Sequence, residues 1–330
     1  MSQTRVEAAV VVNPSRARRT AHILGALLVA VVLPSLVIGA LVGEYGFTAT
    51  WTGVLLGGVG AKLGGTHRMS YLAPLMGLAA GLGAFTAYDW WWAALLATVG
   101  LVAGAGIGFG WFAPLLMVPF AATFVVPEAS ARNAIVYGLI VGVATLYGVV
   151  LARRFGVPAV VDGERLSVPV AAVVAIGFGV VMAASASLGV ALGWTEPYWV
   201  PEPVLILVLY ILMGKRDRIR GKAVGTALGV VAVIPVALVS PPAWVLTALG
   251  VVVFLFALTQ AKTYWLMYGL YTFALVLLLA APGGVGFEAE ERGFQILAGV
   301  ALLVLGLAVV HALANRFAAR DPQPELTMAR

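Results

Sequence analysis

Long apolar stretches separated by short polar segments run along most of the chain. From residue 22 to residue 313 no stretch has the composition of a soluble domain. A helix needs about 20 mostly apolar residues to cross a hydrocarbon core about 30 Å thick, whereas a membrane β-barrel requires segments of about ten residues with alternating polarity. Such alternation is absent. The pattern therefore predicts an all-α, polytopic helical membrane protein.

Hydropathy and turn residues place about twelve transmembrane helices. The second and fifth are short, and no charge marks the turn near residues 108–111, so ten or eleven full spans remain open. The predicted spans cover 22–42, 48–62, 70–88, 90–108, 111–127, 133–152, 168–192, 199–213, 223–240, 243–260, 263–281 and 293–313.

Composition narrows the classes of chemistry. The 330 residues are 62% hydrophobic and only 10% charged, and they include no cysteine. The lack of cysteine removes disulfides, thiolate metal sites and cysteine nucleophiles. Walker, H-E-x-x-H and G-x-S-x-G motifs are absent as well, so we expect neither an enzyme nor a bound cofactor or metal. The 39 glycines recur at four-residue spacing, as in Gly77/Gly81 and Gly225/Gly229, which predicts closely packed helices.

Basic residues are divided unevenly between alternate loops. With the N-terminus inside, all but two of the 20 Lys and Arg residues fall in inner loops or tails, as cytoplasmic loops require. The exceptions are Arg132 and Arg292. This predicts a multi-pass cell-membrane protein with both termini cytoplasmic, in which the five cations between Lys215 and Lys222 form a cytoplasmic loop. The basic pI of about 9.7 then reflects topology rather than binding to nucleic acid.

Two halves of the chain share features at a fixed offset. K-x-x-G-T occurs at 62–66 and again at 222–226, and Arg132 and Arg292 are likewise 160 residues apart. A tandem repeat predicts two parallel six-helix units related by an axis along the membrane normal. The expected organisation is a cytoplasmic tail (1–21), a first repeat (22–152), a cytoplasmic linker (153–167), a second repeat (168–313) and a cytoplasmic tail (314–330).

One stretch carries a family resemblance. Residues 198–229, YWVPEPVLILVLYILMGKRDRIRGKAVGTALG, begin a span with Tyr-Trp, continue through a basic loop and place a basic residue before Gly-Thr-x-x-Gly. This resembles the fusaric acid resistance (FUSC) and aromatic acid exporter family. The later stretches YWLMYGLYTFALVLLL and ERGFQILAG are similar to the family's last two helices. The matching positions are Tyr198, Trp199, Lys222, Gly225, Thr226, Gly229, Arg292 and Gly299.

The resemblance implies export of organic anions, including aromatic carboxylates. Larger relatives carry a sizeable soluble cytoplasmic domain, whereas the two halves here are expected to be joined only by about residues 153–167. Related plant malate transporters are anion channels made of paired six-span subunits. Lysine also stands at 62 and 222 where the family usually has arginine. Regulation through a cytoplasmic domain is therefore not expected.

Candidate substrate-binding residues are cationic or aromatic. Arg132 and Arg292 are interpreted as a pseudo-symmetric pair that attracts anions at the outer ends of two spans; the alternative is that they pair with Glu128 and Glu288. Lys62 and Lys222 start the third and ninth spans, where lysine also serves as a topology anchor. Tyr268 and Tyr271 could stack an aromatic substrate or simply pack.

Three functions remain open at this point. All 14 acidic residues fall in loops, tails or at span ends, which weakens a carboxylate proton relay. The leading hypothesis is a transporter that exports organic anions and is driven by an ion gradient. A passive anion channel and a non-transporting membrane scaffold are the alternatives. The expected partners are the lipid bilayer and a small organic anion, and the sequence leaves the oligomeric state open.

Overall fold

A computed structural model describes residues 29–108, 115–128, 130–159, 166–194, 196–212, 217–239, 241–260, 263–278 and 285–320. Within these ranges all regular structure is helical, which confirms the all-α class. After a first helix over Val29–Val42, the elements are α2 (Glu44–Gly64), α3 (Thr66–Thr86), α4 (Trp90–Gly108), α6 (Met117–Thr123), α7 (Ala131–Arg154), α8 (Val168–Ala191), η1 (Pro197–Trp199), α9 (Pro201–Leu212), α10 (Asp217–Val239), α11 (Ala243–Thr259), α12 (Tyr264–Leu278) and α13 (Val285–Arg320).

Five helices are long and apolar enough to cross a membrane. They are α3, α4, α7, α8 and the Phe294–Arg316 part of α13. Further apolar helices of 10–17 residues cover Val29–Val42, Pro197–Leu209, Val224–Val236 and Tyr264–Leu277. Many large apolar side chains on these helices are exposed, as a lipid-facing surface requires. The chain is thus a multi-pass membrane protein.

The predicted spans agree closely with four of the helices, whereas α10 begins six residues before the predicted 223–240 and α13 extends beyond the predicted 293–313 at both ends. The bounds of α3, α4, α7 and α8 differ from the predicted 70–88, 90–108, 133–152 and 168–192 by at most four residues. The fifth span, 111–127, is wrong as a continuous helix, because α6 has only 7 residues and residues 124–128 are not helical. The turn expected near residues 108–111 falls largely outside the described residues.

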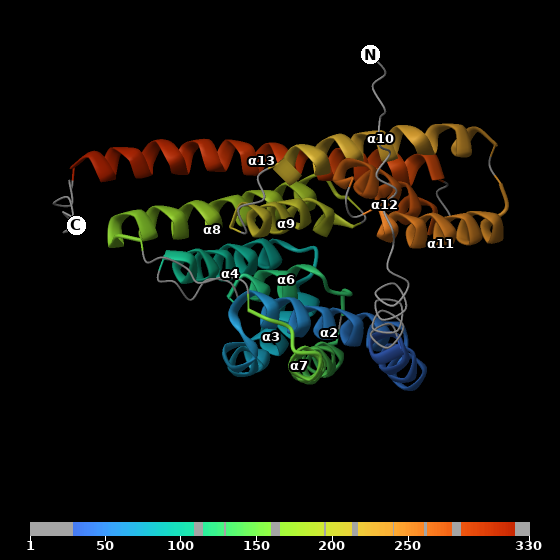
Figure 1. The fold of residues 1–330 in the computed structure, drawn as a ribbon, viewed down its shortest axis with the longest axis horizontal. Coiled ribbons are helices and arrows are strands. Elements are labelled where there is room, and N and C mark those ends of the chain that lie inside the picture. Colours follow the sequence, from blue (N-terminus) through green and yellow to red (C-terminus); the bar gives the residue numbers. More distant parts are fainter. Residues whose placement is uncertain are drawn as a thin grey trace, which may run out of the picture.

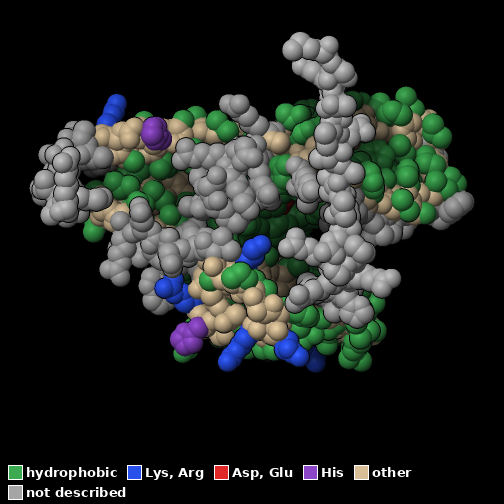
Figure 2. Space-filling view, in the orientation of Figure 1, with side chains coloured by type: hydrophobic (Ala, Val, Ile, Leu, Met, Phe, Trp, Pro, Cys, Tyr) green, Lys and Arg blue, Asp and Glu red, His purple; other side chains and the backbone are tan. Residues whose placement is uncertain are grey.

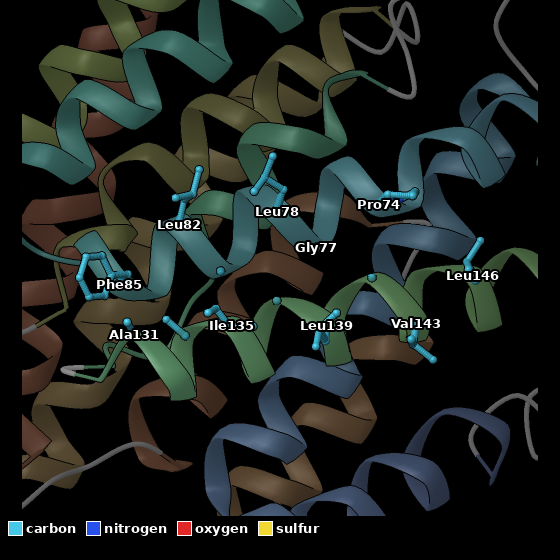
Figure 3. A pocket seen from close by; sticks show the side chains of 14 residues that line it. Pro74, Gly77, Leu78, Leu82, Phe85, Ala131, Ile135, Leu139, Val143 and Leu146 are labelled. Carbon is cyan, nitrogen blue, oxygen red and sulfur yellow. The ribbon is translucent and has the colours of Figure 1, made fainter.

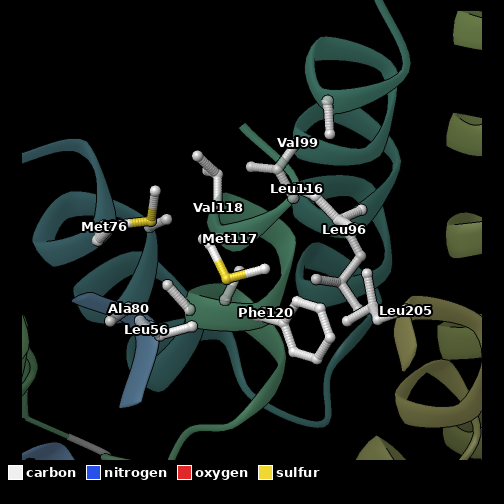
Figure 4. Packing of buried hydrophobic residues seen from close by; sticks show 14 of the residues in the cluster. Leu56, Met76, Ala80, Leu96, Val99, Leu116, Met117, Val118, Phe120 and Leu205 are labelled. Carbon is white, nitrogen blue, oxygen red and sulfur yellow. The ribbon is translucent and has the colours of Figure 1, made fainter. Parts of the chain in front are cut away.

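The short helix α6 is surrounded by protein. All of its residues are buried, and it packs against α3, α4 and α9. Figure 4 shows Met117 and Phe120 of α6 between Met76 and Ala80 on one side and Leu96 on the other. Non-helical backbone at membrane depth is tolerated only where protein or water surrounds it, so burial permits the break after Thr123.

Two groups of helices pack against a middle layer that contains α4 and α8. Figure 1 shows α8 and α13 running side by side, with α2, α3 and α7 gathered below and α10, α11 and α12 at one end. The main buried cluster extends from α2 through α9, whereas a smaller one joins Val233, Leu246, Val276 and Leu277 of α10, α11 and α12. Because α8 packs most extensively on α4, helices on either side of the 153–167 linker share one core.

Glycine faces bring helix pairs into close contact, as their spacing predicts. A Cβ on Gly77 would lie 2.6 Å from the Gly138 carbonyl oxygen, so α3 and α7 cross at backbone contact distance. Similar faces join α2 to α7, α4 to α8 and α10 to α12, through Gly53, Gly57, Gly100, Gly104, Gly225 and Gly229.

An apolar groove of about 590 Å³ follows the α3 and α7 crossing on its outer side. Figure 3 shows Leu78, Leu82 and Phe85 of α3 along one edge and Ile135 and Leu139 of α7 along the other. Leu78, Phe85, Ile135 and Leu139 are all more than half exposed, as expected of side chains that contact lipid tails. The groove therefore belongs to the lipid-facing surface.

The two K-x-x-G-T motifs do not occupy equivalent places. Lys62 lies in the last turn of α2, and Gly65 (φ 89°) separates α2 from α3 in a backbone conformation that suits glycine. Lys222 and Thr226 instead lie within the continuous helix α10. The expectation that both lysines start a span is thus wrong for Lys62, and the arrangement as two six-helix repeats remains a prediction.

Two neighbouring glycines on α2 test the packing account. Gly57→Ala should lower thermal stability by about 1–3 kcal/mol, because its Cβ would overlap the Thr145 carbonyl oxygen of α7. Gly58→Ala is the matched control, since a Cβ there meets nothing within 4 Å, and alanine favours the helix. Thermal unfolding of the purified protein in detergent measures both, and equal effects would contradict the close contact.

Candidate functional site

Lys222 and Glu202 form a buried ion pair between α10 and α9. The Lys222 Nζ donates to both Glu202 carboxylate oxygens at 3.0 Å, and the two side chains are 2% and 9% exposed. Taking two charges out of water costs several kcal/mol for each ion, and only close, well-oriented contact offsets this. A buried ion pair with such a desolvation cost is unusual in a stretch of chain that is otherwise apolar.

The pair lies well inside the bundle. Glu202 is buried in the first turn of α9, ten residues before the end of the helix, which is about 15 Å along a helix axis. Lys222 lies more than one turn inside α10, which begins at Asp217. The basic stretch is thus partly helix rather than loop, whereas Lys215 and Arg216 lie outside the described residues.

Aromatic side chains enclose the ammonium group. The Lys222 Nζ lies 5.1 Å from the ring centroid of Tyr268, within the range of a cation–π contact. Tyr271 packs against Tyr268 in a tilted arrangement, with ring centroids 6.1 Å apart and an interplanar angle of 60°. Trp199 and Ile296 complete the wall from η1 and α13 around a cavity of about 20 Å³. That volume holds about one water molecule, so the site is closed in this conformation.

One face of α10 builds the site. Lys222, Gly225, Thr226 and Gly229 follow one another at helical spacing, so they share a side of the helix. A Cβ on Gly225 or Gly229 would overlap the carbonyl oxygen of Trp265 or Gly269 on α12. The two glycines thus let α12 approach closely enough for Tyr268 and Tyr271 to cover Lys222.

An aromatic cluster holds the chain just before α9. Trp199 donates from Nε1 to Glu196 at 2.9 Å, and Tyr198 stacks on Tyr88 with centroids 6.4 Å apart. Tyr88 lies in the turn between α3 and α4 in a left-handed backbone conformation (φ 67°). Burial, and secondarily the Glu196 charge, raises the pKa of the Tyr88 hydroxyl well above its usual range, so Tyr88 stays neutral. The cluster fixes the point where α9 enters the interior.

Two buried polar side-chain atoms, one on α10 and one on α13, lack a hydrogen-bond partner among the described residues. They are the Thr226 hydroxyl, which lines the cavity, and Oε1 of Gln295 on α13. The Gln295 amide nitrogen donates to Glu291 at 2.8 Å. Buried polar groups are normally paired, so unpartnered ones mark a place where a water, a ligand or a shifted side chain binds.

Three of the predicted site residues meet here and three do not. Lys222, Tyr268 and Tyr271 line one cavity. Lys62 is exposed at the end of α2, and Arg132 is exposed in the first turn of α7, where Glu128 accepts from Asn133 at 3.1 Å. Arg292 lies two turns inside α13, so it is not placed as Arg132 is, and its side chain falls outside the described part.

Sequence reasoning missed Glu202. It counted this carboxylate as the outer end of a span and Lys222 as the inner end of the next, on opposite membrane faces, whereas the two are in contact. The error arises because α9 has only 12 residues and its first turn, with Glu202, packs beside Lys222 of α10. The available signal was a single carboxylate inside the apolar stretch YWVPEPVLILVLYIL, since an intramembrane ionisable residue implies a partner.

The ion pair can be tested by a double-mutant cycle. Lys222→Met should destabilise the protein by about 3–5 kcal/mol, because it leaves Glu202 buried without a counter-charge. Glu202→Met combined with Lys222→Met should recover most of the stability. Thermal melting in detergent measures the cycle, with Lys62→Met as the exposed control. Additive losses would show that the two side chains do not interact.

Comparison with known proteins bears on the segment that holds the site. The fusaric acid resistance protein-like family matches residues 181–306, which include η1 and α9 to α12 in full. No curated protein and no solved structure matches the chain. The matched segment contains both partners of the ion pair and the tyrosines that cover it. Over residues 181–306 the comparison therefore confirms the resemblance of this chain to the fusaric acid resistance family.

Proposed function

We propose that the protein is a membrane transporter for organic anions, with Lys222 as the centre of anion binding. The family match suggests a transport or efflux role for a multi-pass membrane protein. The observation that carries the proposal is the Lys222 ammonium group, which is 2% exposed and enclosed by aromatic rings within a helical bundle. Buried cations in membrane helices are costly and mark substrate or ion pathways.

The lining of the cavity favours a carboxylate that carries an aromatic or apolar group. The Glu202 carboxylate is bound to the Lys222 ammonium group, and an organic acid would present the same chemical group to Lys222. Tyr268 and Tyr271 offer ring faces beside it, and aromatic pairs contribute about 0.5–1.5 kcal/mol beyond the area they bury. Aromatic carboxylates are thus the substrate class that we expect, and export driven by an ion gradient is the direction that the family resemblance implies.

The small volume of the cavity favours a carrier over an open channel. A cavity of about 20 Å³ admits no organic anion, so binding requires a rearrangement of the helices around it. Carriers bind substrate near the membrane midplane and expose the site to one side at a time. A continuously open pore would need a wider passage.

The proposed orientation places both termini and the 153–167 linker in the cytoplasm. Figure 2 shows basic side chains gathered near the lower edge of the view, over α2, α3 and α7, while apolar side chains cover much of the rest. Lys62, Arg68, Arg153 and Arg154 are exposed at the end of α2, the start of α3 and the end of α7. Their location supports a cytoplasmic assignment by the enrichment of cytoplasmic loops in Lys and Arg.

Flux of a panel of radiolabelled aromatic and aliphatic carboxylates into proteoliposomes tests the function. Lys222→Gln should reduce the flux about tenfold or more, since a charge-assisted contact to a carboxylate contributes about 1.5–3 kcal/mol. Lys62→Gln removes a lysine from the exposed end of α2 and should leave flux unchanged. Equal flux in both variants would remove Lys222 from the pathway.

The mode of transport follows from the same preparation. A carrier should show counterflow, in which unlabelled anion on one side accelerates entry of label from the other. A channel would instead carry voltage-driven current without such stimulation, and a scaffold would show neither.

Arg132 and Arg292 remain proposed as anion-attracting residues of the outer surface. A positive charge at a low-dielectric rim raises the local anion concentration, and the guanidinium group fits a carboxylate. Arg132→Gln and Arg292→Gln should each reduce anion flux at unchanged membrane abundance, most strongly when combined and at low salt. Arg153→Gln, at the opposite end of α7 from Arg132, is the control. Undiminished flux in the inserted double variant would leave the two arginines as surface charges.

A further inference from the structure

We propose that Glu202 is an internal competitor for the substrate carboxylate at Lys222, so that one anion binds only together with one proton. The inference rests on the proposed function and adds to it a fixed coupling between anion and proton.

The geometry makes binding an exchange. Both oxygens of Glu202 lie 3.0 Å from the Lys222 Nζ, so Glu202 uses the ammonium group as a substrate carboxylate would. The cavity of about 20 Å³ has no room for a second carboxylate beside the first. An incoming anion therefore reaches Lys222 only when Glu202 moves away.

The net charge of the buried site then determines whether Glu202 is protonated when an anion is bound. The pair of ionised Glu202 and Lys222 is neutral, and so is a protonated Glu202 beside an anion bound to Lys222. An ionised Glu202 together with a bound anion would leave one uncompensated negative charge in a site that is more than nine-tenths buried. An uncompensated buried charge costs several kcal/mol, so the two neutral states dominate. They differ by one anion and one proton.

The displaced carboxyl group has a hydrogen-bond partner at hand. A protonated carboxyl donates one O–H bond, and the buried Thr226 hydroxyl that lines the cavity has no partner among the described residues. The Thr226 hydroxyl can therefore accept this hydrogen bond when Glu202 leaves Lys222.

Few other ionisable groups face Glu202. Among the described side chains, α6 and α8 contribute none, α10 contributes Lys222, and α12 contributes Tyr268 and Tyr271. The residues around η1 add Glu196 and Tyr198, with Glu196 bound to Trp199, and α13 adds Glu291, which is bound to Gln295. Glu202 is therefore the carboxylate in direct contact with the cation, and the proton is assigned to it.

The coupling has a consequence for transport. A carrier that cycles between the two neutral states moves a monovalent anion and a proton in the same direction and carries no net charge. Its return step moves the ion pair without substrate. An inward proton gradient therefore opposes export, so under this coupling the ion gradient that drives export is the outward gradient of the anion itself and not the proton gradient.

Binding of benzoate to the purified full-length protein tests the coupling. Titration calorimetry in two buffers of different ionisation enthalpy should report uptake of about one proton per benzoate. The Kd should rise with pH, by about tenfold per pH unit over the range in which binding takes up one full proton. Glu202→Gln should abolish both effects and keep tight binding at high pH, whereas Glu128→Gln, in the α6–α7 connection, should change neither.

The outcomes separate the two proposals. Benzoate binding that is independent of pH and takes up no proton in the wild type overturns the coupling and leaves the transporter proposal standing, even if Glu202→Gln fails to fold. Retained proton uptake in a folded Glu202→Gln variant assigns the proton elsewhere and overturns the role of Glu202. No benzoate binding at any pH, by wild type or variant, overturns the aromatic-anion function together with the coupling.

Discussion

The contact between Lys222 and Glu202 sets the conditions that the surrounding structure meets. Two full charges in an apolar bundle persist only when each compensates the other at close range, here 3.0 Å, and when water and lipid stay away. The glycine face of α10 admits α12, whose tyrosines cover the ammonium group, and the aromatic cluster at η1 fixes where α9 begins. The architecture of the second half of the chain can be understood as the enclosure of this pair.

The helices enclose the ion pair through close packing at small residues and not through further polar side chains. Lipid tails are as apolar as leucine, so helices in a membrane gain little from hiding apolar surface and associate through packing instead. Small residues at the crossings of α3 with α7, α4 with α8 and α10 with α12 let backbones meet. The same close packing leaves almost no free volume around Lys222, which links helix movement to any exchange of its partner.

The sequence predicted the positions of several helices well, but it did not predict which distant segments contact one another. Apolar length predicted α7 and α8 almost to the residue, because a bilayer imposes a minimum run of apolar residues. It failed at residues 111–127, where α6 is short and buried, because hydropathy does not distinguish burial in lipid from burial in protein. It also treated Lys62 and Lys222 as equivalents, whereas a left-handed glycine at 65 ends a helix in one motif and a continuous helix carries the other.

The sequence by itself determined the class of this protein: a helical membrane protein with small-residue faces, basic segments between spans and motifs of the fusaric acid resistance family. These follow from composition and from periodicity along one helix, which are local properties. Only the tertiary structure decided that Glu202 meets Lys222 and that Tyr268 and Tyr271 cover them, while Lys62 and Arg132 remain exposed. That outcome depends on where the 12-residue helix α9 starts relative to α10 and on how closely α12 approaches α10, and both are set by tertiary packing.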